Sequence, residues 1–186
     1  KTKIDPTILK DARGFNHLFD LTSILIRNFL NHTLDKKNKK KILDLGTGRY
    51  AILSIFIKKK HIHSNVIASD INENFIRHAD INCKRNNVEV KCVVSNLFQN
   101  IDDRDFDLII WNLPYYEDPN LYLKNFFEES ILRTTKDGQL ILGFNSFATT
   151  SKKIEDILND FVQLKIIQIK KYLWNNHKII LVQKTG

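Results

Sequence analysis

The chain has 186 residues, of which 42% are hydrophobic, and a formal net charge of +8 at pH 7. That length suits one domain with a buried core, and no apolar run reaches the roughly 20 residues that a membrane span needs. The net charge is compatible with nucleic acid, because clustered Lys and Arg neutralise phosphates. However, Lys outnumbers Arg by 22 to 7, and Arg is the residue suited to bidentate phosphate contacts.

The two cysteines, Cys83 and Cys92, form neither a metal motif nor a disulfide framework. The sequence also shows no secretory signal pattern. We therefore expect a cytoplasmic protein that binds no metal.

Strand-like and helix-like stretches alternate along the chain. Apolar residues recur at three- and four-residue spacing from Phe15 to Phe29, which predicts an amphipathic helix before the first strand. Short β-branched runs predict strands at residues 41–45, 66–70, 90–94, 106–111, 139–144, 164–169 and 178–183. Helical patterns fall between them, at about residues 50–60, 73–86, 121–134 and 151–161, with a turn signal at 136–138. This alternation predicts an α/β fold with a mostly parallel sheet.

A glycine-rich loop, Asp44-Leu-Gly-Thr-Gly-Arg-Tyr-Ala51, follows the first predicted strand. Gly46 and Gly48 allow a tight turn and a close approach to a ligand, and the next helix offers free N–H donors. Asp70 ends the second strand, where nucleotide-binding α/β folds place an acid for ribose hydroxyls. The spacing also fits a dinucleotide fingerprint, so a nicotinamide enzyme is an alternative. Asp44 weighs against it, because a carboxylate there suits a cationic ligand better than a pyrophosphate.

The fourth predicted strand runs directly into Asn112-Leu-Pro-Tyr115. Ligands of open parallel sheets bind outside the carboxyl ends of the strands, which is where this segment falls. The side-chain oxygen of Asn112 and the carbonyl of Leu113 can accept the two hydrogens of a planar NH₂ group. Pro114 stiffens the turn, and Tyr115 offers a flat face for stacking. The segment is thus suited to an amide or a nucleobase amine.

Four segments, in order, resemble class I S-adenosylmethionine-dependent methyltransferases: Ile42–Gly48, Ala68–Asn72, Ser95–Phe98 and Phe106–Tyr115. Within that class the chain resembles the HemK-type and "methyltransferase small" groups, which methylate protein glutamine or base amines in RNA. The sequence Asn-Leu-Pro-Tyr itself resembles the corresponding motif of rRNA adenine dimethyltransferases. The resemblance implies a Rossmann-like, seven-stranded, mostly parallel sheet with helices on both faces. It also implies a single domain over residues 1–186, with an N-terminal helical segment at about 1–40.

The resemblance implies a role for each matching residue. Those that would bind S-adenosyl-L-methionine are Asp44, Gly46, Thr47, Gly48, Asp70, Ile71, Asn96, Leu97 and Asn112. Those that would hold the acceptor nitrogen are Asn112, Leu113, Pro114 and Tyr115. Asn96 departs from the family, which prefers Asp there, and Arg49 stands where a small residue is common.

We therefore predict an N-methyltransferase acting on a planar amino or amide nitrogen of a macromolecule, either an RNA base or a protein glutamine. A small-molecule methyltransferase and a non-catalytic cofactor-binding domain are the alternatives. The lysine runs at 36–41 and 58–60 should lie at the amino edge of the sheet, opposite the predicted site. Charge therefore adds little support for RNA, and the basic candidates near the site are Lys10, Arg13, Arg49 and Arg77.

Overall fold

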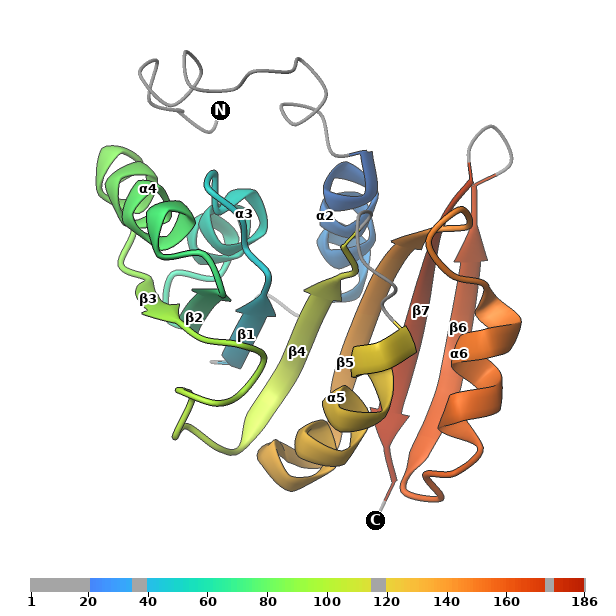
Figure 1. The fold of residues 1–186 in the computed structure, drawn as a ribbon. Coiled ribbons are helices and arrows are strands. Elements are labelled where there is room, and N and C mark those ends of the chain that lie inside the picture. The colour runs from blue at the N-terminus through green and yellow to red at the C-terminus, as the bar shows by residue number, and fades with distance from the viewer. Residues whose placement is uncertain (1–20, 35–39, 115–119, 173–175, 186) are drawn as a thin grey trace.

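A computed structural model describes residues 21–34, 40–114, 120–172 and 176–185, which build a seven-stranded sheet flanked by helices (Figure 1). The strands are β1 (Lys41–Leu45), β2 (Asn65–Asp70), β3 (Lys91–Val94), β4 (Phe106–Asn112), β5 (Thr134–Asn145), β6 (Leu164–Lys171) and β7 (His177–Lys184). The helices are α2 (Leu21–Thr33), α3 (Ile52–Lys60), α4 (Glu73–Arg85), α5 (Asn120–Arg133) and α6 (Ser151–Leu158).

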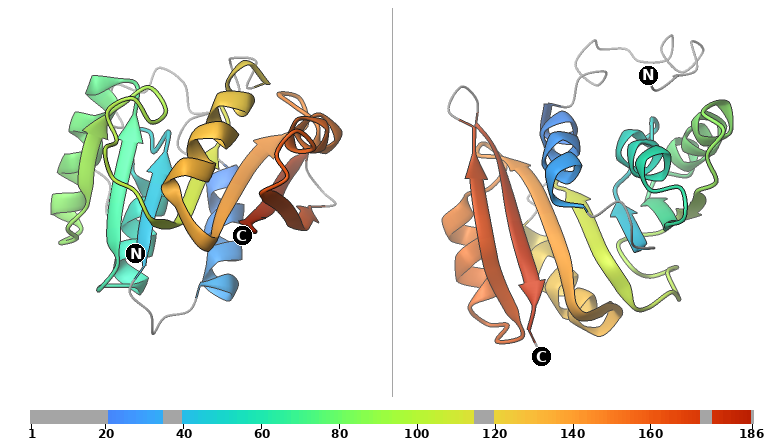
Figure 2. Two further views of the ribbon diagram at one scale, coloured as in Figure 1. Left: turned by 90° about the horizontal axis from the view of Figure 1, so that it is seen from below. Right: turned by 180° about the vertical axis from the view of Figure 1, so that it is seen from behind.

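The strand order is β3-β2-β1-β4-β5-β7-β6, and only β7 runs against its neighbours. Helices α2, α3 and α4 cover one face and α5 and α6 the other, as the view from behind in Figure 2 shows. The predicted Rossmann-like, mostly parallel sheet with helices on both faces is therefore confirmed. The chain leaves β1 toward β2 on one side and returns to β4 on the other, so a crevice opens between the carboxyl ends of β1 and β4.

Helix α2 lies close to the sheet, above the carboxyl end of β5. Its buried face contains Ile26, which packs with residues of β5 and β7. The approach depends on Gly143 of β5, because a Cβ there would stand 2.5 Å from Ile26 Cδ1 and 2.7 Å from Thr22 Cγ2. Gly143 pairs in register with Asn112 at the end of β4. The first turn of α2 is thus brought over the predicted acceptor segment.

The structure differs from the sequence prediction at the start of β5. The turn predicted at residues 136–138 lies inside this long strand, where Asp137 has a φ of 63°. The pairing register of β5 with β4 shifts here, between Phe106 and Leu108. The turn residues therefore form an irregularity within the strand, and regular pairing resumes at Gln139.

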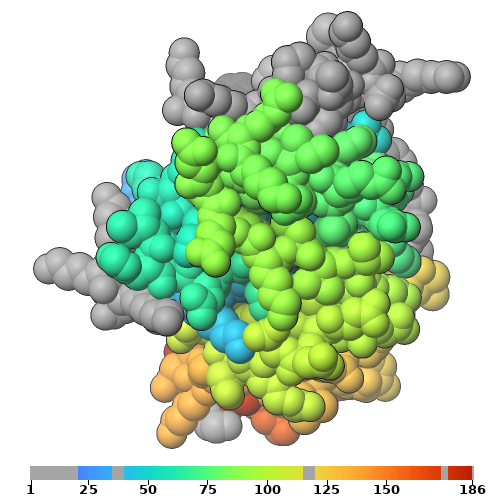
Figure 3. Space-filling model, turned by 90° about the vertical axis from the view of Figure 1, so that its left-hand side faces the viewer, coloured from blue at the N-terminus to red at the C-terminus, as the bar shows by residue number. Residues whose placement is uncertain are grey.

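Helix α4 begins as its sequence predicts, because the Asn72 side chain accepts hydrogen bonds from the backbone N–H groups of Asn74 and Phe75. Figure 3 looks at the edge of the sheet that α4, β3 and the segment after β3 cover.

Within the described ranges, no helix has the length and apolar character needed to cross a membrane.

Candidate active site

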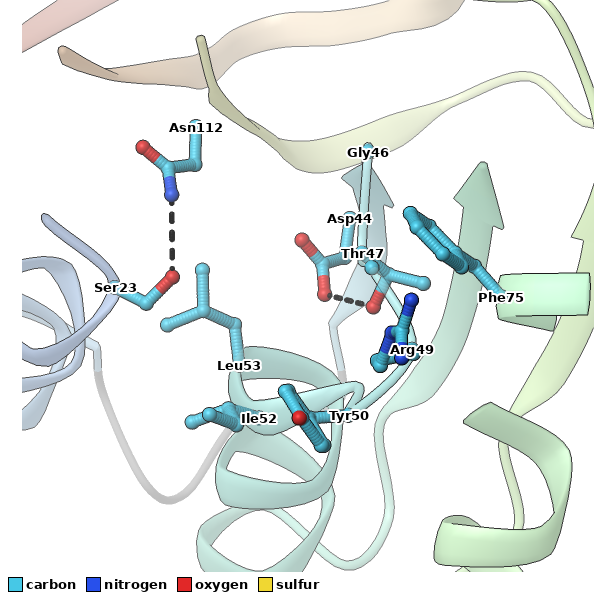
Figure 4. A pocket seen from close by; sticks show the side chains of 11 residues that line it. Ser23, Asp44, Gly46, Thr47, Arg49, Tyr50, Ile52, Leu53, Phe75 and Asn112 are labelled. Atoms are coloured by element: carbon cyan, nitrogen blue, oxygen red, sulfur yellow. Dashed lines mark hydrogen bonds between the residues drawn. The ribbon is translucent and has the colours of Figure 1, made fainter. Parts of the chain in front are cut away.

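A cavity of about 390 Å³ lies at the carboxyl ends of β1 and β4 (Figure 4). Its walls come from the glycine loop after β1, the first turn of α3, the start of α4, the end of β4 and the first turn of α2. The lining residues are Ser23, Asp44, Gly46, Thr47, Gly48, Arg49, Tyr50, Ile52, Leu53, Phe75 and Asn112. This volume lies within the range of sites for small ligands and cofactors.

Backbone conformation shapes the glycine loop. Gly46 and Gly48 both have a φ of 64°, and Ala51 repeats this left-handed conformation with a φ of 47°. Three contacts hold the loop. The Thr47 N–H donates to the Ser69 carbonyl at 2.9 Å, the Gly48 N–H donates to Asp70 Oδ2 at 3.0 Å, and the Asn82 amide donates to the Arg49 carbonyl at 3.1 Å. The loop is therefore fixed against both β2 and α4.

Asp44 supplies a buried carboxylate to the cavity, with only 2% of the residue exposed. Its Oδ2 accepts hydrogen bonds from Ser54 Oγ at 2.6 Å and from Thr47 Oγ1 at 2.8 Å. Burial raises the pKa of Asp44 to about 6, although these hydrogen bonds oppose the rise. In Figure 4 the other carboxylate oxygen lies on the side of Asn112. A cationic group in the cavity would favour the charged form of this acid.

Asp70 anchors the glycine loop to the end of β2. Its two oxygens accept hydrogen bonds from the Gly48 N–H, at 3.0 Å, and from the Asn72 N–H, at 2.9 Å. Burial raises the pKa of Asp70, and the backbone donors oppose that rise. A carboxylate has about four lone-pair positions, so acceptor capacity remains for ligand hydroxyls. Loop anchoring is a role that the sequence did not predict.

Asn112 stands at the end of β4 with its carboxamide oriented by α2. Its Nδ2 donates to Ser23 Oγ at 3.2 Å, and Figure 4 shows the side-chain oxygen pointing away from Ser23. The next N–H, of Leu113, donates to the Gly143 carbonyl at 2.8 Å, while the Leu113 side chain is buried in the core. Pro114 follows, and Tyr115 lies outside the described residues. The predicted acceptor segment therefore begins from a rigid base.

The structure gathers some of the predicted residues around the cavity and not others. Asp44, Gly46, Thr47, Gly48 and Asn112 all line it. The other predicted residues that the structure describes do not line it: Asp70, Leu113 and Pro114, and also Ile71, Asn96 and Leu97. The last three lie just beyond the ends of β2 and β3, where Ile71 is 67% exposed. Roles for these three in binding adenine stay predictions.

Several lining or supporting residues were not predicted from the sequence. Ser23 is a polar residue beside the apolar face of α2, and nothing in its local pattern connects it with Asn112. Phe75 was not predicted either, whereas Arg49 was a basic candidate near the site; its guanidinium lies over the Phe75 ring, 4.7 Å from the ring centre, and both side chains line the cavity. Ser54 follows Asp44 by ten residues, in the first turn of α3, where a hydroxyl can reach back to the strand end. Lys10 and Arg13 lie outside the described residues.

Comparison with known proteins identifies the family. The sequence model of one protein family, the methyltransferase small domain, matches residues 20–172 of this chain. The release factor glutamine methyltransferase of Haemophilus influenzae is 35% identical over 107 residues, which cover 52% of this chain and 36% of that protein. The ribosomal RNA small subunit methyltransferase C of the same species is 26% identical over 132 residues, covering 69% and 39%. The chain thus spans about two fifths or less of the length of these relatives.

Solved structures share the fold. The crystal structure of the ribosomal protein L11 methylase of Lactobacillus delbrueckii subsp. bulgaricus has a TM-score of 0.75 and 21% identity, covering all of this chain and 86% of that one. The resemblance seen in four sequence segments is confirmed at the level of the family, whereas the Asn-Leu-Pro-Tyr motif stays a prediction. The chain belongs to the methyltransferase small domain family.

Proposed function

We propose that this chain transfers a methyl group from S-adenosyl-L-methionine to a planar amino or amide nitrogen of a macromolecule, an RNA base or a protein glutamine. The supporting observation is the Asn112 carboxamide, which Ser23 orients beside a cavity that contains a buried carboxylate. The names of the two relatives, a glutamine methyltransferase and a ribosomal RNA methyltransferase, support this class of acceptor.

The cavity residues fit the cofactor. Asp44 is a buried acid with spare acceptor capacity, which suits the positively charged amino acid part of the cofactor. Arg49 offers a guanidinium for the carboxylate of that part. Asp70 would accept from the ribose hydroxyls, and Ile71, Asn96 and Leu97 would contact the adenine. The bound cofactor supplies a methyl group that its sulfonium already activates.

The residues of the chain then have to orient the acceptor. The lone pair of an amide or aromatic amine is delocalised, which makes this nitrogen a weak nucleophile. Asn112 Oδ1 and the Leu113 carbonyl would accept the two N–H hydrogens, hold the nitrogen in line and favour positive charge on it. Pro114 keeps the turn rigid, and Tyr115 would stack on the acceptor plane. No general base is required before transfer, because the C–S bond breaks to leave a neutral thioether and the methylated nitrogen then loses one proton to water.

Two further expectations belong to this proposal. We propose one domain over residues 1–186, supported by the family match to residues 20–172. The free thiols of Cys83 and Cys92 support a reducing, cytoplasmic setting.

Radiolabelled methyl transfer to fractionated tRNA, rRNA, release factors, ribosomal proteins and small metabolites tests the proposal. We expect incorporation into one macromolecular fraction, and we expect Asn112→Ala to lower it by at least about a hundredfold. Calorimetric titration should show that Asn112→Ala still binds S-adenosyl-L-methionine. Asn159→Ala, at the far end of α6, is the matched control and should keep full activity.

Two results would contradict the proposal. Incorporation confined to small metabolites would support the small-molecule alternative. Full activity in the Asn112→Ala variant would remove the role of this carboxamide.

A further inference from the structure

Basic residues from three separate segments lie at the carboxyl edge of the sheet, the same edge as the candidate site. Strands β5 and β6 run in the same direction, because both pair antiparallel with β7. Their carboxyl ends, the start of β7 and the start of α6 therefore share the edge at which Asn112 pairs with Gly143 (Figure 1). The lysines at that edge, named the upper lysine group, are Lys152, Lys153, Lys171 and Lys178.

Two of these lysines face each other. Lys171 of β6 and Lys178 of β7 are direct register partners, and like charges in that position destabilise a sheet. Lys178 is also paired with Phe144 of β5, whose side chain is in the core formed with α6, so both lysines project on the α6 face. Lys152 pairs with Asp156 at 3.4 Å. Within the described part of the chain, no carboxylate forms an ion pair with the other three lysines.

An aromatic side chain accompanies the upper lysine group. Phe147, in the loop from β5 to α6, is 87% exposed. The loop is tied down on both sides, because the Ser146 N–H donates to the Asn176 carbonyl at 2.8 Å and the Thr149 hydroxyl donates to Asn120 Oδ1 at 2.9 Å. A fixed loop thus holds a phenyl ring in solvent, at the same edge as three lysines that form no ion pair with a carboxylate of the described residues.

We propose that Phe147 and the upper lysine group form a binding surface for single-stranded RNA, with a base stacked on Phe147 and phosphates on Lys153, Lys171 and Lys178. Ring faces stack on any base, and lysines neutralise the backbone beside them. An acidic polypeptide would use the charges but would not need a projecting ring. This surface rests on the proposed function, because the bound strand would carry the acceptor base toward Asn112. The proposed surface favours an RNA base over a protein glutamine as the methyl acceptor.

Fluorescence anisotropy with a fluorescein-labelled single-stranded RNA of mixed sequence, about 16 nucleotides long, measures this binding without methyl transfer. We expect Phe147→Ala to weaken binding roughly tenfold, and Phe147→Tyr, which keeps the ring, to bind like the wild type. The double variant Lys171→Gln with Lys178→Gln should reduce the slope of log affinity against log salt by about 1.4. Lys59→Gln with Lys60→Gln, at the end of α3 on the opposite edge, removes the same charge and should leave the slope nearly unchanged.

Equal losses in both double variants would overturn the proposal, because net charge alone would then explain the binding. Unchanged RNA affinity in Phe147→Ala would also overturn it. So would a variant that keeps RNA affinity but loses methylation of a release factor or ribosomal protein, because the surface would then recognise a polypeptide. Failure of the proposed function would instead appear as absent S-adenosyl-L-methionine binding in calorimetry, which the anisotropy measurement does not involve.

Discussion

The two edges of the sheet carry lysines in opposite electrostatic settings. At the amino edge, Lys41 and Lys91 lie 3.0 and 2.8 Å from the Asp103 carboxylate, and Lys40 lies 3.8 Å from Asp107. At the carboxyl edge, the lysines of β6 and β7 face each other. A net charge of +8 therefore does not identify a binding surface. The proposed surface instead rests on where lysines lack a carboxylate partner among the described residues.

The carboxyl groups at the two edges also differ, in the direction of their pKa shifts. Hydrogen bonds from Lys91 and Lys41 lower the pKa of Asp103, whereas burial raises the pKa of Asp44 to about 6. Asp103 is stabilised as an anion by its partners, whereas burial disfavours the anion of Asp44, which a cationic ligand would stabilise. The ion pairs of Asp103 at the amino edge thus stabilise the fold. At the carboxyl edge, the buried Asp44 carboxylate destabilises the fold when it is charged, unless a cationic ligand is bound.

The largest expected difference between the edges is in cofactor binding. Asp44→Asn keeps the shape of the side chain but removes its charge, so the affinity for S-adenosyl-L-methionine should fall by roughly 10- to 100-fold. The same change should raise the free energy of unfolding near neutral pH by roughly 1–2 kcal/mol, because a buried charge is lost. Calorimetric titration and urea unfolding measure the two effects.

Asp103→Asn is the control for this comparison. It should leave cofactor affinity unchanged and lower the free energy of unfolding by less than about 1 kcal/mol, because its ion pairs lie near the surface. Equal losses of cofactor affinity in the two variants would remove the special role of Asp44.

The two acids should also respond to pH with opposite signs. The pKa of Asp44 is raised in the folded state, so its contribution to stability falls as pH rises from about 4 to about 6. The pKa of Asp103 is lowered, so its contribution is present above about pH 4 and is lost as pH falls through the lowered value. Cofactor affinity should increase as pH rises through about 6, because Asp44 then loses its proton. Calorimetric titration across this interval should show the increase, and Asp44→Asn should abolish it.

A smaller effect is expected from the bond that orients Asn112. Ser23→Ala removes the acceptor of the Asn112 Nδ2 hydrogen bond, so the rate of methyl transfer should fall about fivefold while the cofactor dissociation constant stays the same. Ser23→Thr keeps a hydroxyl and should restore the rate. Thr33→Ala, at the other end of α2, is the control. A rate loss that comes with a matching loss of thermal stability would indicate a structural role only.

Charge reversal should give the smallest effects, with opposite signs at the two edges. Lys171→Glu places an acid opposite Lys178 and should stabilise the fold by about 0.5 kcal/mol. Lys91→Glu places an acid beside Asp103 and should destabilise it by about 0.5–1 kcal/mol. Urea unfolding at low and high salt measures both, and the differences should shrink in high salt. A change of the same sign in the free energy of unfolding of both variants would contradict the contrast between the edges.

Much of the site could be predicted because its signals are local. Gly46 and Gly48 adopt the positive φ that favours glycine, Asn72 caps the helix that follows it, and Asp70 ends its strand beside the loop. Each of these depends on neighbouring residues or on one strand-loop-helix unit, so a short stretch of sequence contains the information. The alternation of such units also predicted the sheet and its mostly parallel direction.

Contacts across long sequence separations could not be predicted in this way. Ser23 and Asn112 are 89 residues apart, and they meet because Gly143 lets α2 approach β5. The turn signal at 136–138 correctly indicated an irregular backbone, but pairing with β4 decided that it would lie inside a strand.

Residue order by itself was enough for the glycine loop, the acids at the strand ends and the family of the chain, because these follow from local backbone preferences and short motifs. Only the tertiary structure decided which lysines are paired with acids, which hydroxyl orients Asn112, and that the loop with Phe147 lies at the edge where Lys171 pairs with Lys178. The physical reason is that these contacts join segments far apart in the sequence, such as α2 with the end of β4 and β1 with the segment before β4, which meet only when the sheet is assembled.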